Sequence, residues 1–137
     1  MYTFEDLKSI METLRSEKGC PWDRAQTHDS LKRHLVEECA EALEAMDEKD
    51  PENLCEELGD VLFQVMIHSE IEKEAGNFTV DDVVDQICEK MIRRHPRIFG
   101  GEEPEIREGE NLWTAIKRQE REQKAARKRA AGKTAEK

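Results

Sequence analysis

Five acidic side chains fall into two short clusters whose spacing could place them around a metal ion. One cluster reads Glu37-Glu38-x-x-Glu41 and the other reads Glu57-x-x-Asp60. Residues three or four apart share one face of a helix, so each cluster would point its carboxylates in one direction. Carboxylates that converge without a counter-charge repel one another and are costly to remove from water. A hard divalent cation such as Mg²⁺, or Mn²⁺ in its place, removes that cost and favours oxygen ligands.

The abundance of acidic residues supports a plainer interpretation of the same clusters. Asp and Glu make up 32 of 137 residues, so short acidic spacings arise by chance, mostly on solvated helix faces. Position argues against chance, because Glu38 falls within an apolar stripe that includes Leu35 and Ala42. A half-buried carboxylate can equally pair with Lys or Arg. Spacing alone therefore leaves both a metal site and an ion-pair network open.

A basic pair with helical spacing occurs farther along the chain, at Lys90 and Arg94. One interpretation is a cationic helix end that offsets the helix dipole. The other is a phosphate clamp, since Arg offers a fork of donors to phosphate oxygens and Lys offers a mobile point charge. Phosphate is also the substrate group that we expect beside a carboxylate-bound Mg²⁺.

The tryptophans and histidines give weaker signals. Trp22 and Trp113 either anchor the core or pack against a base, and we favour the core because only seven residues are aromatic. The four histidines follow no ligand pattern, and the sequence has no P-loop, no H-E-x-x-H and no Gly-x-Ser-x-Gly motif. No constellation for nucleophilic catalysis stands out.

The segments that must position these residues carry the 3.6-residue period of helices, and none alternates as a strand does. We expect helices over 3–17, 27–48, 51–75, 79–95 and from 111 to about 119, with loops at 19–23 and 100–110. Asp50-Pro51 marks a short turn, so the second and third helices should form an antiparallel hairpin that brings the acid clusters to similar heights. The predicted fold is an all-α helical bundle built on this hairpin.

Composition excludes several classes of protein. The net charge is −10 and the mean hydropathy is −0.87, which indicates a soluble protein. No apolar run is long enough to cross a bilayer and no signal peptide follows Met1, so no membrane partner is expected. The four cysteines lack C-x-x-C spacing and are interpreted as buried thiols of a cytoplasmic protein rather than as zinc ligands.

The charges are distributed unevenly along the chain. Residues 117–137 hold nine Lys or Arg and three Glu, whereas the preceding residues hold 13 basic and 29 acidic side chains. An acidic body does not suit a nucleic-acid groove, so no nucleic-acid partner is expected. Residues 124–137 contain no large apolar side chain. We therefore predict a helical domain over 1–123, followed by a flexible basic tail over 124–137.

The third expected helix has more apolar surface than a hairpin with two short flanking helices can cover. Its large apolar residues Leu58, Val61, Leu62, Val65 and Met66 spread more than halfway round the helix. A second copy of the chain, most simply related by a two-fold axis, would cover the remainder. We expect a homodimer or a homotetramer.

Five segments in order resemble the MazG family of nucleoside triphosphate pyrophosphohydrolases, over about residues 4 to 123. They are Gly19-Cys20-Pro21-Trp22-Asp23 with Gln26-Thr27-x-x-Ser30-Leu31, Glu37-Glu38-x-x-Glu41, Glu56-Glu57-Leu58-Gly59-Asp60, Lys90-x-x-Arg93-Arg94-His95-Pro96-x-x-Phe99, and Trp113-x-x-Ile116-Lys117-x-x-Glu120. Longer bacterial MazG proteins carry two such domains in tandem, and this chain has one.

The resemblance implies an all-α fold, assembly as a dimer or higher oligomer, and Mg²⁺-dependent cleavage of an NTP or dNTP to the monophosphate and pyrophosphate. Clearance of non-standard nucleotides would be one use of that activity. An alternative is a non-catalytic helical module that binds a nucleotide or a cation and interacts with a partner protein. The presence of both Lys90 and Arg94 beside a complete acid set favours the enzyme.

The resemblance also implies a role for each residue that matches a motif. The implied metal ligands are Glu38, Glu41, Glu57 and Asp60. The implied catalytic carboxylates are Glu37 and Glu38, with Glu37 as a further ligand or as the base. The implied phosphate-binding residues are Lys90, Arg94 and Lys117. Trp22 and Trp113 are candidates for contact with the base or for closing the site.

Overall fold

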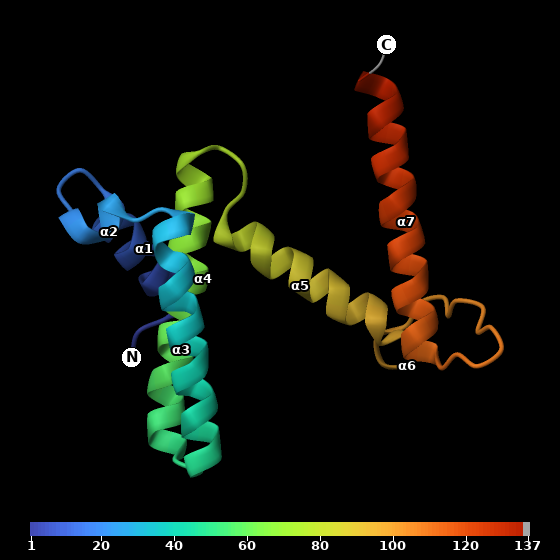
Figure 1. Cartoon of the computed structure of the whole chain (residues 1–137), viewed down its shortest axis with the longest axis horizontal. Helices are drawn as coiled ribbons and strands as arrows, with labels where there is room; N and C mark the ends of the chain where they lie inside the picture. Colours follow the sequence, from blue (N-terminus) through green and yellow to red (C-terminus); the bar gives the residue numbers. More distant parts are fainter. Residues whose placement is uncertain (136–137) are drawn as a thin grey trace. The chain divides into compact units, whose positions relative to one another are not determined.

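The computed structural model describes residues 1–135, and every regular element in that range is a helix (Figure 1). In chain order the helices are α1 Phe4–Arg15, α2 Pro21–Ala25, α3 His28–Glu48, α4 Pro51–Glu74, α5 Val80–Arg94, α6 Pro96–Phe99 and α7 Leu112–Ala135. This confirms the all-α fold class. The chain forms two compact units, residues 1–84 and the residues from 85 onward, and the boundary falls within α5.

Side-chain caps begin the helices where the sequence predicts. The Thr3 hydroxyl accepts from the backbone N–H of Asp6 while the Asp6 carboxylate accepts from the Thr3 N–H, which forms a capping box. Thr27 and Ser30 make the same reciprocal pair at the start of α3. The carboxylate of Asp50 accepts from two backbone N–H groups of the first turn of α4. These caps confirm the predicted starts of three helices.

One predicted loop contains a short helix. Residues 19–23 were expected to be irregular, yet α2 begins at Pro21, where the missing proline N–H would have had no partner within the helix in any case. Gly19 precedes α2, and its backbone lies close to the backbone of the end of α1. A Cβ atom at Gly19 would collide with the carbonyl oxygens of Thr13 and Leu14. The tight connection between α1 and α2 therefore requires glycine at this position.

The last helix is longer than the sequence predicts. Apolar residues become rare after about Gln119, but α7 continues to Ala135. This stretch is rich in Ala, Arg, Lys, Gln and Glu, which favour helix even without an apolar face. The predicted domain boundary at residue 123 and the flexibility of 124–137 stay predictions, and residues 136–137 lie outside the described part of the chain.

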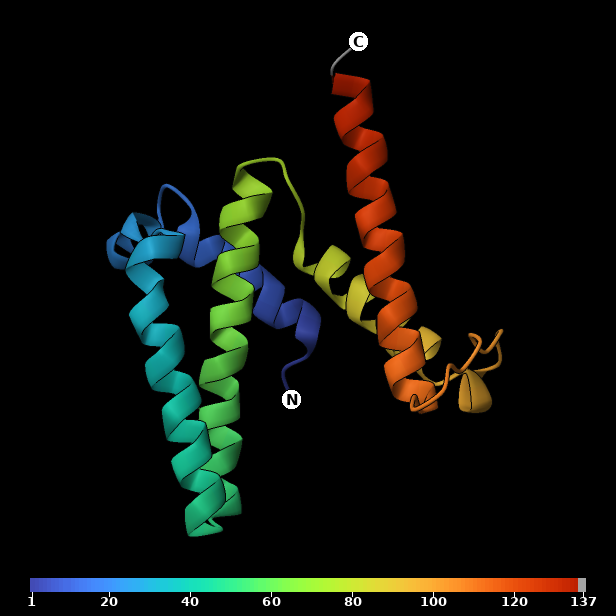
Figure 2. The same ribbon diagram turned by 45° about the vertical axis from the view of Figure 1, so that its right-hand side comes forward.

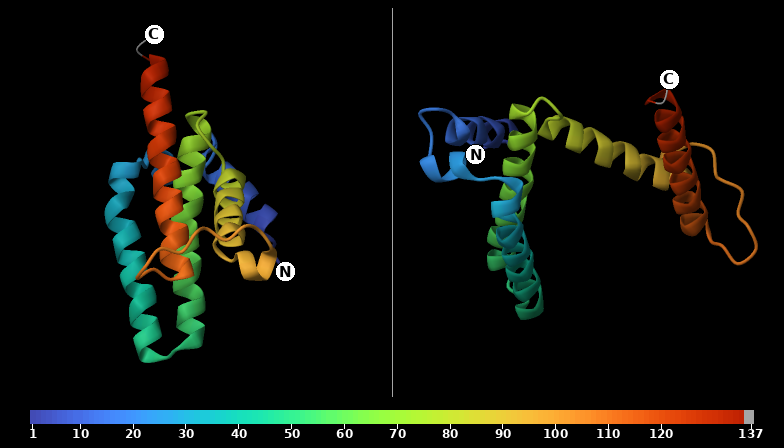
Figure 3. Two further views of the ribbon diagram at one scale, coloured as in Figure 1. Left: turned by 90° about the vertical axis from the view of Figure 1, so that its right-hand side faces the viewer. Right: turned by 45° about the horizontal axis from the view of Figure 1, so that its top comes forward.

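The first unit is built on the predicted antiparallel hairpin of α3 and α4, which lie side by side from the tight turn onward (Figures 2 and 3). Lys49 adopts the left-handed conformation, with φ of 57°, and so ends α3 directly before Asp50 caps α4. Helix α1 packs against α4, and α2 packs against α1. The buried core consists of Met11, Leu31, Met66, Ile67 and Val80.

A single arginine joins three segments of the first unit. Arg15, whose side chain is 7% exposed, donates through Nε and Nη2 to the carboxylate of Glu74, at 2.7 and 2.8 Å. Its Nη1 donates to the backbone carbonyls of Asp23 and Gln26. The guanidinium therefore ties the end of α1 to α2 and to the last turn of α4. Its positive charge lowers the pKa of the Glu74 carboxyl.

In the second unit, α6 and the loop over 100–111 lie between α5 and α7 in sequence. Ala115 and Ile116 are buried on the first turns of α7. Arg118 donates to the carboxylate of Glu110 and to the backbone carbonyl of Glu105, so it fastens the loop to α7. This loop is thus held by ion pairs and hydrogen bonds more than by apolar packing.

The expectation of buried cysteines is wrong. Three of the four, Cys39, Cys55 and Cys88, are exposed on helix faces that turn away from the cores of their units, and all four are free. In contrast, the predicted uncovered surface on α4 is present: Leu58 is 49% exposed, and Leu62 and Val65 are also exposed. Among the described helices, none combines the length and apolar character needed to cross a lipid bilayer.

Replacing Arg15 by Ala should lower the free energy of unfolding by about 2 kcal/mol, because it removes the charged donor from two part-buried backbone carbonyls and from the Glu74 carboxylate. The pKa of Glu74 is lowered in the folded state, so the ion pair stabilises above the unfolded pKa of about 4.3 and is lost as pH falls through the folded value. Urea denaturation at pH 7 and pH 3 should show the gap between wild type and variant shrinking in acid.

A matched control for that experiment is Arg97→Ala, which removes an exposed pair with Glu103. Exposed pairs contribute little, so this change should leave the unfolding free energy nearly unchanged at both pH values. An equal loss in the two variants would show that Arg15 contributes no more than a surface charge.

Candidate functional site

Three carboxylates converge across the hairpin. One oxygen from each of Glu38 and Glu41 on α3 and Glu57 on α4 lies within 4.8 Å of the others. Glu38 and Glu57 are half-buried, whereas Glu41 is exposed. Such spacing suits carboxylates that share one cation, because oxygen ligands lie at about 2.0–2.6 Å from Mg²⁺ or Ca²⁺. The sequence prediction that the two clusters meet at similar heights is confirmed for these three residues.

Asp60 lies beside this cluster rather than within it. It is exposed, and its oxygens are not among those within 4.8 Å. Its negative charge nevertheless raises the pKa of both Glu38 and Glu57. A side chain that interacts with both acids in this way is close enough to act as a further ligand, which stays a prediction.

The cluster carries negative charge that no base among residues 1–135 offsets. Burial raises the pKa of Glu38, and the charges of Asp60, Glu41 and Glu57 raise it further. The pKa of Glu57 is raised by burial and then by neighbouring acids, with Glu41 first among them. Within the described residues no Lys, Arg or His counters either shift. The arrangement therefore favours a cation-binding site over an ion-pair network, and this donor set fits Mg²⁺.

Glu37 has partners of its own outside the cluster. Its carboxylate accepts from Arg33 Nε at 2.7 Å and lies 3.7 Å from His34 Nδ1. Adjacent helical residues point about 100° apart, so Glu37 turns away from the face that Glu38 occupies. Its role as a ligand or a base stays a prediction.

Neither tryptophan is buried, so the expectation that both anchor the core is wrong. Trp22 is 51% exposed, and its ring meets the edge of His34 with centroids 5.8 Å apart. Trp113 is 42% exposed and carries two cations against its ring, the Arg94 guanidinium at 5.1 Å and the Lys117 ammonium at 5.6 Å. The charged neighbourhood of each ring leaves too little apolar surface to enclose it.

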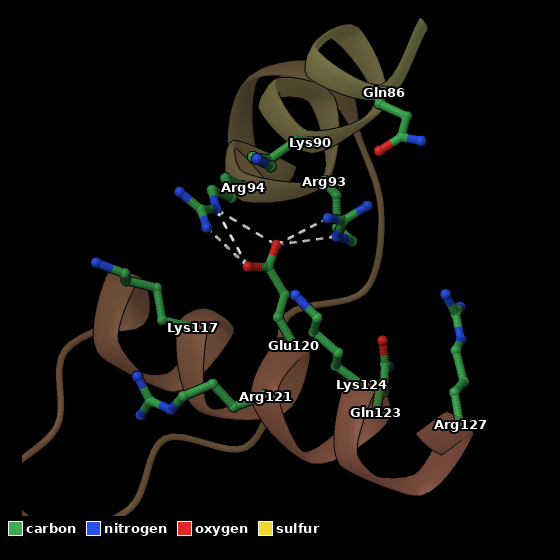
Figure 4. Close-up of a pocket in the computed structure, with 10 residues that line it drawn as sticks. All are labelled: Gln86, Lys90, Arg93, Arg94, Lys117, Glu120, Arg121, Gln123, Lys124 and Arg127. Atoms are coloured by element: carbon green, nitrogen blue, oxygen red, sulfur yellow. Dashed lines mark hydrogen bonds and ion pairs between the residues drawn. The ribbon is translucent and has the colours of Figure 1, made fainter. Parts of the chain in front are cut away.

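The three predicted phosphate-binding residues meet in the second unit, at a basic cleft of about 560 Å³ between α5 and α7 (Figure 4). The residues that line this cleft are Gln86, Lys90, Arg93, Arg94, Lys117, Glu120, Arg121, Gln123, Lys124 and Arg127. Seven of them are cationic and only one is anionic. A concave surface with this excess of positive charge suits a polyanion such as a triphosphate.

Glu120 organises the two arginines of α5. Its carboxylate lies between both guanidinium groups in Figure 4, at 2.9 Å from Arg94 Nη2 and 3.0 Å from Arg93 Nε. These bonds, with Arg94 the stronger partner, lower the pKa of Glu120. Lys90 and Lys117 are in no ion pair within the described residues. Two ammonium groups thus stay available while Glu120 holds the arginines in place.

Sequence reasoning missed four cations of this cleft. Arg93 was seen only as part of a motif, and Arg121, Lys124 and Arg127 were assigned to a solvated end of the chain. On α7, Lys117, Arg121, Lys124 and Arg127 follow one another at intervals of three or four residues, which is the signal that they share one helix face. The signal was ambiguous because a solvated helix has the same pattern.

Comparison with known proteins identifies the family. Residues 26–99 match the model of the MazG nucleotide pyrophosphohydrolase domain. The chain is 53% identical over 121 residues to the nucleoside triphosphate pyrophosphohydrolase/pyrophosphatase MazG of Thermotoga maritima, covering 88% of this chain and 46% of that protein. It is 40% identical over 128 residues to the nucleoside triphosphate pyrophosphohydrolase of Escherichia coli K12, covering 91% and 48%.

A solved structure supports the same relationship. The crystal structure of a mazG-related protein from Thermotoga maritima matches with a TM-score of 0.64 and 29% identity, covering 83% of this chain and 98% of that chain. The chain spans about half the length of the curated relatives that it matches. Because the matched domain takes in both acid clusters and covers more than half of the sequence, the chain belongs to the MazG nucleotide pyrophosphohydrolase family.

Proposed function

We propose that this chain hydrolyses a nucleoside triphosphate to the nucleoside monophosphate and pyrophosphate with the help of Mg²⁺. The observation that carries the proposal is the convergence of Glu38, Glu41 and Glu57 without a basic partner among the described residues. The basic cleft around Lys90, Arg94 and Lys117 supplies complementary charge for phosphates. The activity named for the curated relatives supports the same reaction.

In this proposal the acid cluster holds the cation and orients water. Glu38, Glu41 and Glu57 would bind Mg²⁺, with Asp60 as a further ligand. When bound, the cation would neutralise phosphate charge and lower the pKa of a water molecule. A carboxylate that is not committed to the cation, for which Glu37 is the candidate, would orient the attacking water as general base.

The basic cleft of the second unit would bind phosphate groups of the substrate. Arg94 presents a planar fork to phosphate oxygens, and Lys90 and Lys117 add point charges. Glu120 fixes the plane of Arg94, so less rotational freedom is lost when phosphate binds. Trp113 lies against two of these cations and would close the site over them.

Two further properties belong to the proposal. The exposed apolar residues of α4, among them Leu58, Leu62 and Val65, support a homodimer or homotetramer in which a second copy covers them. Discrimination among normal and non-standard nucleotides would use the base, for which Trp22 and His34 offer exposed rings that meet edge to face.

Neutralising one ligand should abolish turnover. Glu38→Gln or Glu41→Gln should reduce pyrophosphate release from NTPs in Mg²⁺ by more than the roughly 10–100-fold that loss of a residue supporting a metal ligand costs. Glu48→Gln, an exposed change on the same helix, is the control and should keep normal turnover. Near-normal activity in both ligand variants would contradict the assignment.

The same substitution should stabilise the metal-free protein. Burial, and then crowding with other acids, raises the pKa of Glu38, so its ionised form opposes folding and Glu38→Gln removes the buried charge and the repulsion. In EDTA at pH 7 the variant should melt at a higher temperature than the wild type. Added Mg²⁺ should raise the melting temperature of the wild type and do so much less for the variant. Equal responses to Mg²⁺ would show that the cation binds elsewhere.

Removing the carboxylate that orients the arginines should weaken substrate binding. Glu120→Gln keeps the size of the side chain but loses the charge that holds Arg93 and Arg94. We expect kcat/KM for NTPs to fall roughly tenfold, mostly through KM. Glu122→Gln, which alters a neighbouring acid paired with Arg107 and Arg118, should have little effect. A variant at Glu120 that binds NTP more tightly would show that Glu120 competes with the substrate instead.

A further inference from the structure

The basic cleft of the second unit is longer than a triphosphate. Its cations on α7, from Lys117 through Arg121 and Lys124 to Arg127, follow one another at about one per helical turn. With a rise of about 1.5 Å per residue, Lys117 and Arg127 lie roughly 15 Å apart along the helix. The three phosphates of an NTP reach only part of that distance. The end of the cleft beyond Lys117 therefore has no ligand in the proposed function.

Glu120 divides the cleft into two halves (Figure 4). Its carboxylate lies between the guanidinium groups of Arg94 and Arg93. Lys117 lies on the side of Arg94, and Arg127 lies on the side of Arg93. The near half contains the three predicted phosphate-binding residues, and the far half presents three cations and two amides. The residues of the far half are Gln86, Arg93, Gln123, Lys124 and Arg127. Two separate groups of positive charge suit two separate groups of negative charge.

The α7 cations of the cleft beyond Glu120 are unpaired, although acids are plentiful in this chain. Elsewhere in the second unit, Arg97, Arg107 and Arg118 all pair with glutamates. On the cleft face of α7, in contrast, three exposed cations make no ion pair and no hydrogen bond within residues 1–135. They are Arg121, Lys124 and Arg127. Like charges on one surface repel one another until a ligand neutralises them, so the far half is open to an anion.

The charge of the second unit permits a nucleic-acid ligand. The sequence as a whole indicates no such ligand, because the chain is acidic. That excess of acids belongs to the first unit: residues 1–84 hold 8 basic and 22 acidic side chains, whereas residues 85–137 hold 14 basic and 10 acidic ones. The unit that contains the cleft therefore has a net positive charge, which favours the binding of a phosphate backbone.

Two observations favour a chain of nucleotides over other anionic partners. Residues 117–135 of α7 contain no large apolar side chain, so this part of the helix has nothing to insert into a membrane surface. Gln86 and Gln123 make no hydrogen bond within the described residues, and each offers an amide oxygen as acceptor beside its N–H donors. A chain of phosphates alone has no use for an acceptor, whereas the hydroxyl and amino groups of nucleotides donate to one.

We propose that the far half of the cleft binds the phosphodiesters of a single-stranded RNA whose 5′-triphosphate occupies the near half. A triphosphate joined to a chain of phosphodiesters supplies the two groups of negative charge in the required order. Cations repeated along one helix face can follow such a backbone, as positively charged grooves do in other proteins that bind single strands. The inference rests on the proposed function for assigning the near half to a triphosphate, and it extends the ligand from a mononucleotide to the 5′ end of a chain.

The test measures binding in EDTA, where no turnover interferes. Fluorescence anisotropy should show that a short single-stranded RNA with a 5′-triphosphate and a 3′ label binds roughly tenfold more tightly than ATP, whose affinity is measured by competition. The logarithm of the RNA binding constant should also fall more steeply with the logarithm of salt concentration, by about 0.7 for each further phosphate contact. The same RNA with a 5′-hydroxyl should bind roughly tenfold more weakly, because it leaves the near half empty.

Two double variants that remove equal charge test the assignment. Lys124→Gln with Arg127→Gln removes two cations of the far half, so the ratio of RNA affinity to ATP affinity should fall roughly tenfold, to near one. Lys128→Gln with Arg129→Gln removes the same charge from positions of α7 that do not line the cleft, and it should leave that ratio unchanged. All four side chains are exposed, so both double variants should fold and melt close to the wild type.

Any of four results overturns the inference. They are RNA that binds no more tightly than ATP, equal affinity for the 5′-hydroxyl and 5′-triphosphate RNAs, equal losses in the two double variants, and displacement of the RNA by polyphosphate or polyglutamate as readily as by unlabelled RNA. If NTPs are hydrolysed in Mg²⁺ but one of these results is found, the RNA site fails and the proposed function stands. If no NTP is hydrolysed but RNA binds as expected, the proposed function fails and the RNA site stands.

Discussion

The repulsion among three carboxylates on the α3–α4 hairpin is the constraint on which the candidate site depends. Helix axes approach according to the size of the side chains between them, and Ala42 and Ala45 are both buried on α3 beside the acids. These small residues let α4 come close enough to place Glu57 within 4.8 Å of Glu38 and Glu41. Apolar packing of the hairpin thus holds together charges that would otherwise separate, and a bound cation would remove the resulting strain.

Features that follow from local spacing could be predicted from the sequence. The caps at Thr3 and Thr27 and the turn at Asp50-Pro51 fix where helices begin, and the hairpin follows from the shortness of that turn. Residue spacing then decides which acids share a face. The three converging carboxylates could therefore be located before the structure, whereas the position of Asp60 just outside them depends on how the helices are rotated, which spacing does not determine.

Features that depend on which surface covers a residue could not be predicted in the same way. Trp22, Trp113 and three cysteines are of types that are usually buried, yet all five are exposed because the surfaces around them offer no apolar partner. The basic residues of α7 after Lys117 show the opposite case, because residues that look solvated in the sequence line a cleft. Their charges resemble those of a solvated end, and they form one side of a basic cleft only because the cations of α5 face them.

The two units carry opposite unbalanced charges, and each calls for a different kind of partner. In the first unit the pKa values of Glu38 and Glu57 are raised by burial and by neighbouring acids, and no base among the described residues counters either shift. In the second unit the basic cleft holds seven cations against one carboxylate. A solvated acidic face would leave its carboxylates in water, yet Glu38 and Glu57 are half-buried. Like charges gathered in this way repel until an oppositely charged group binds, so the acid cluster favours a cation and the basic cleft favours an anion.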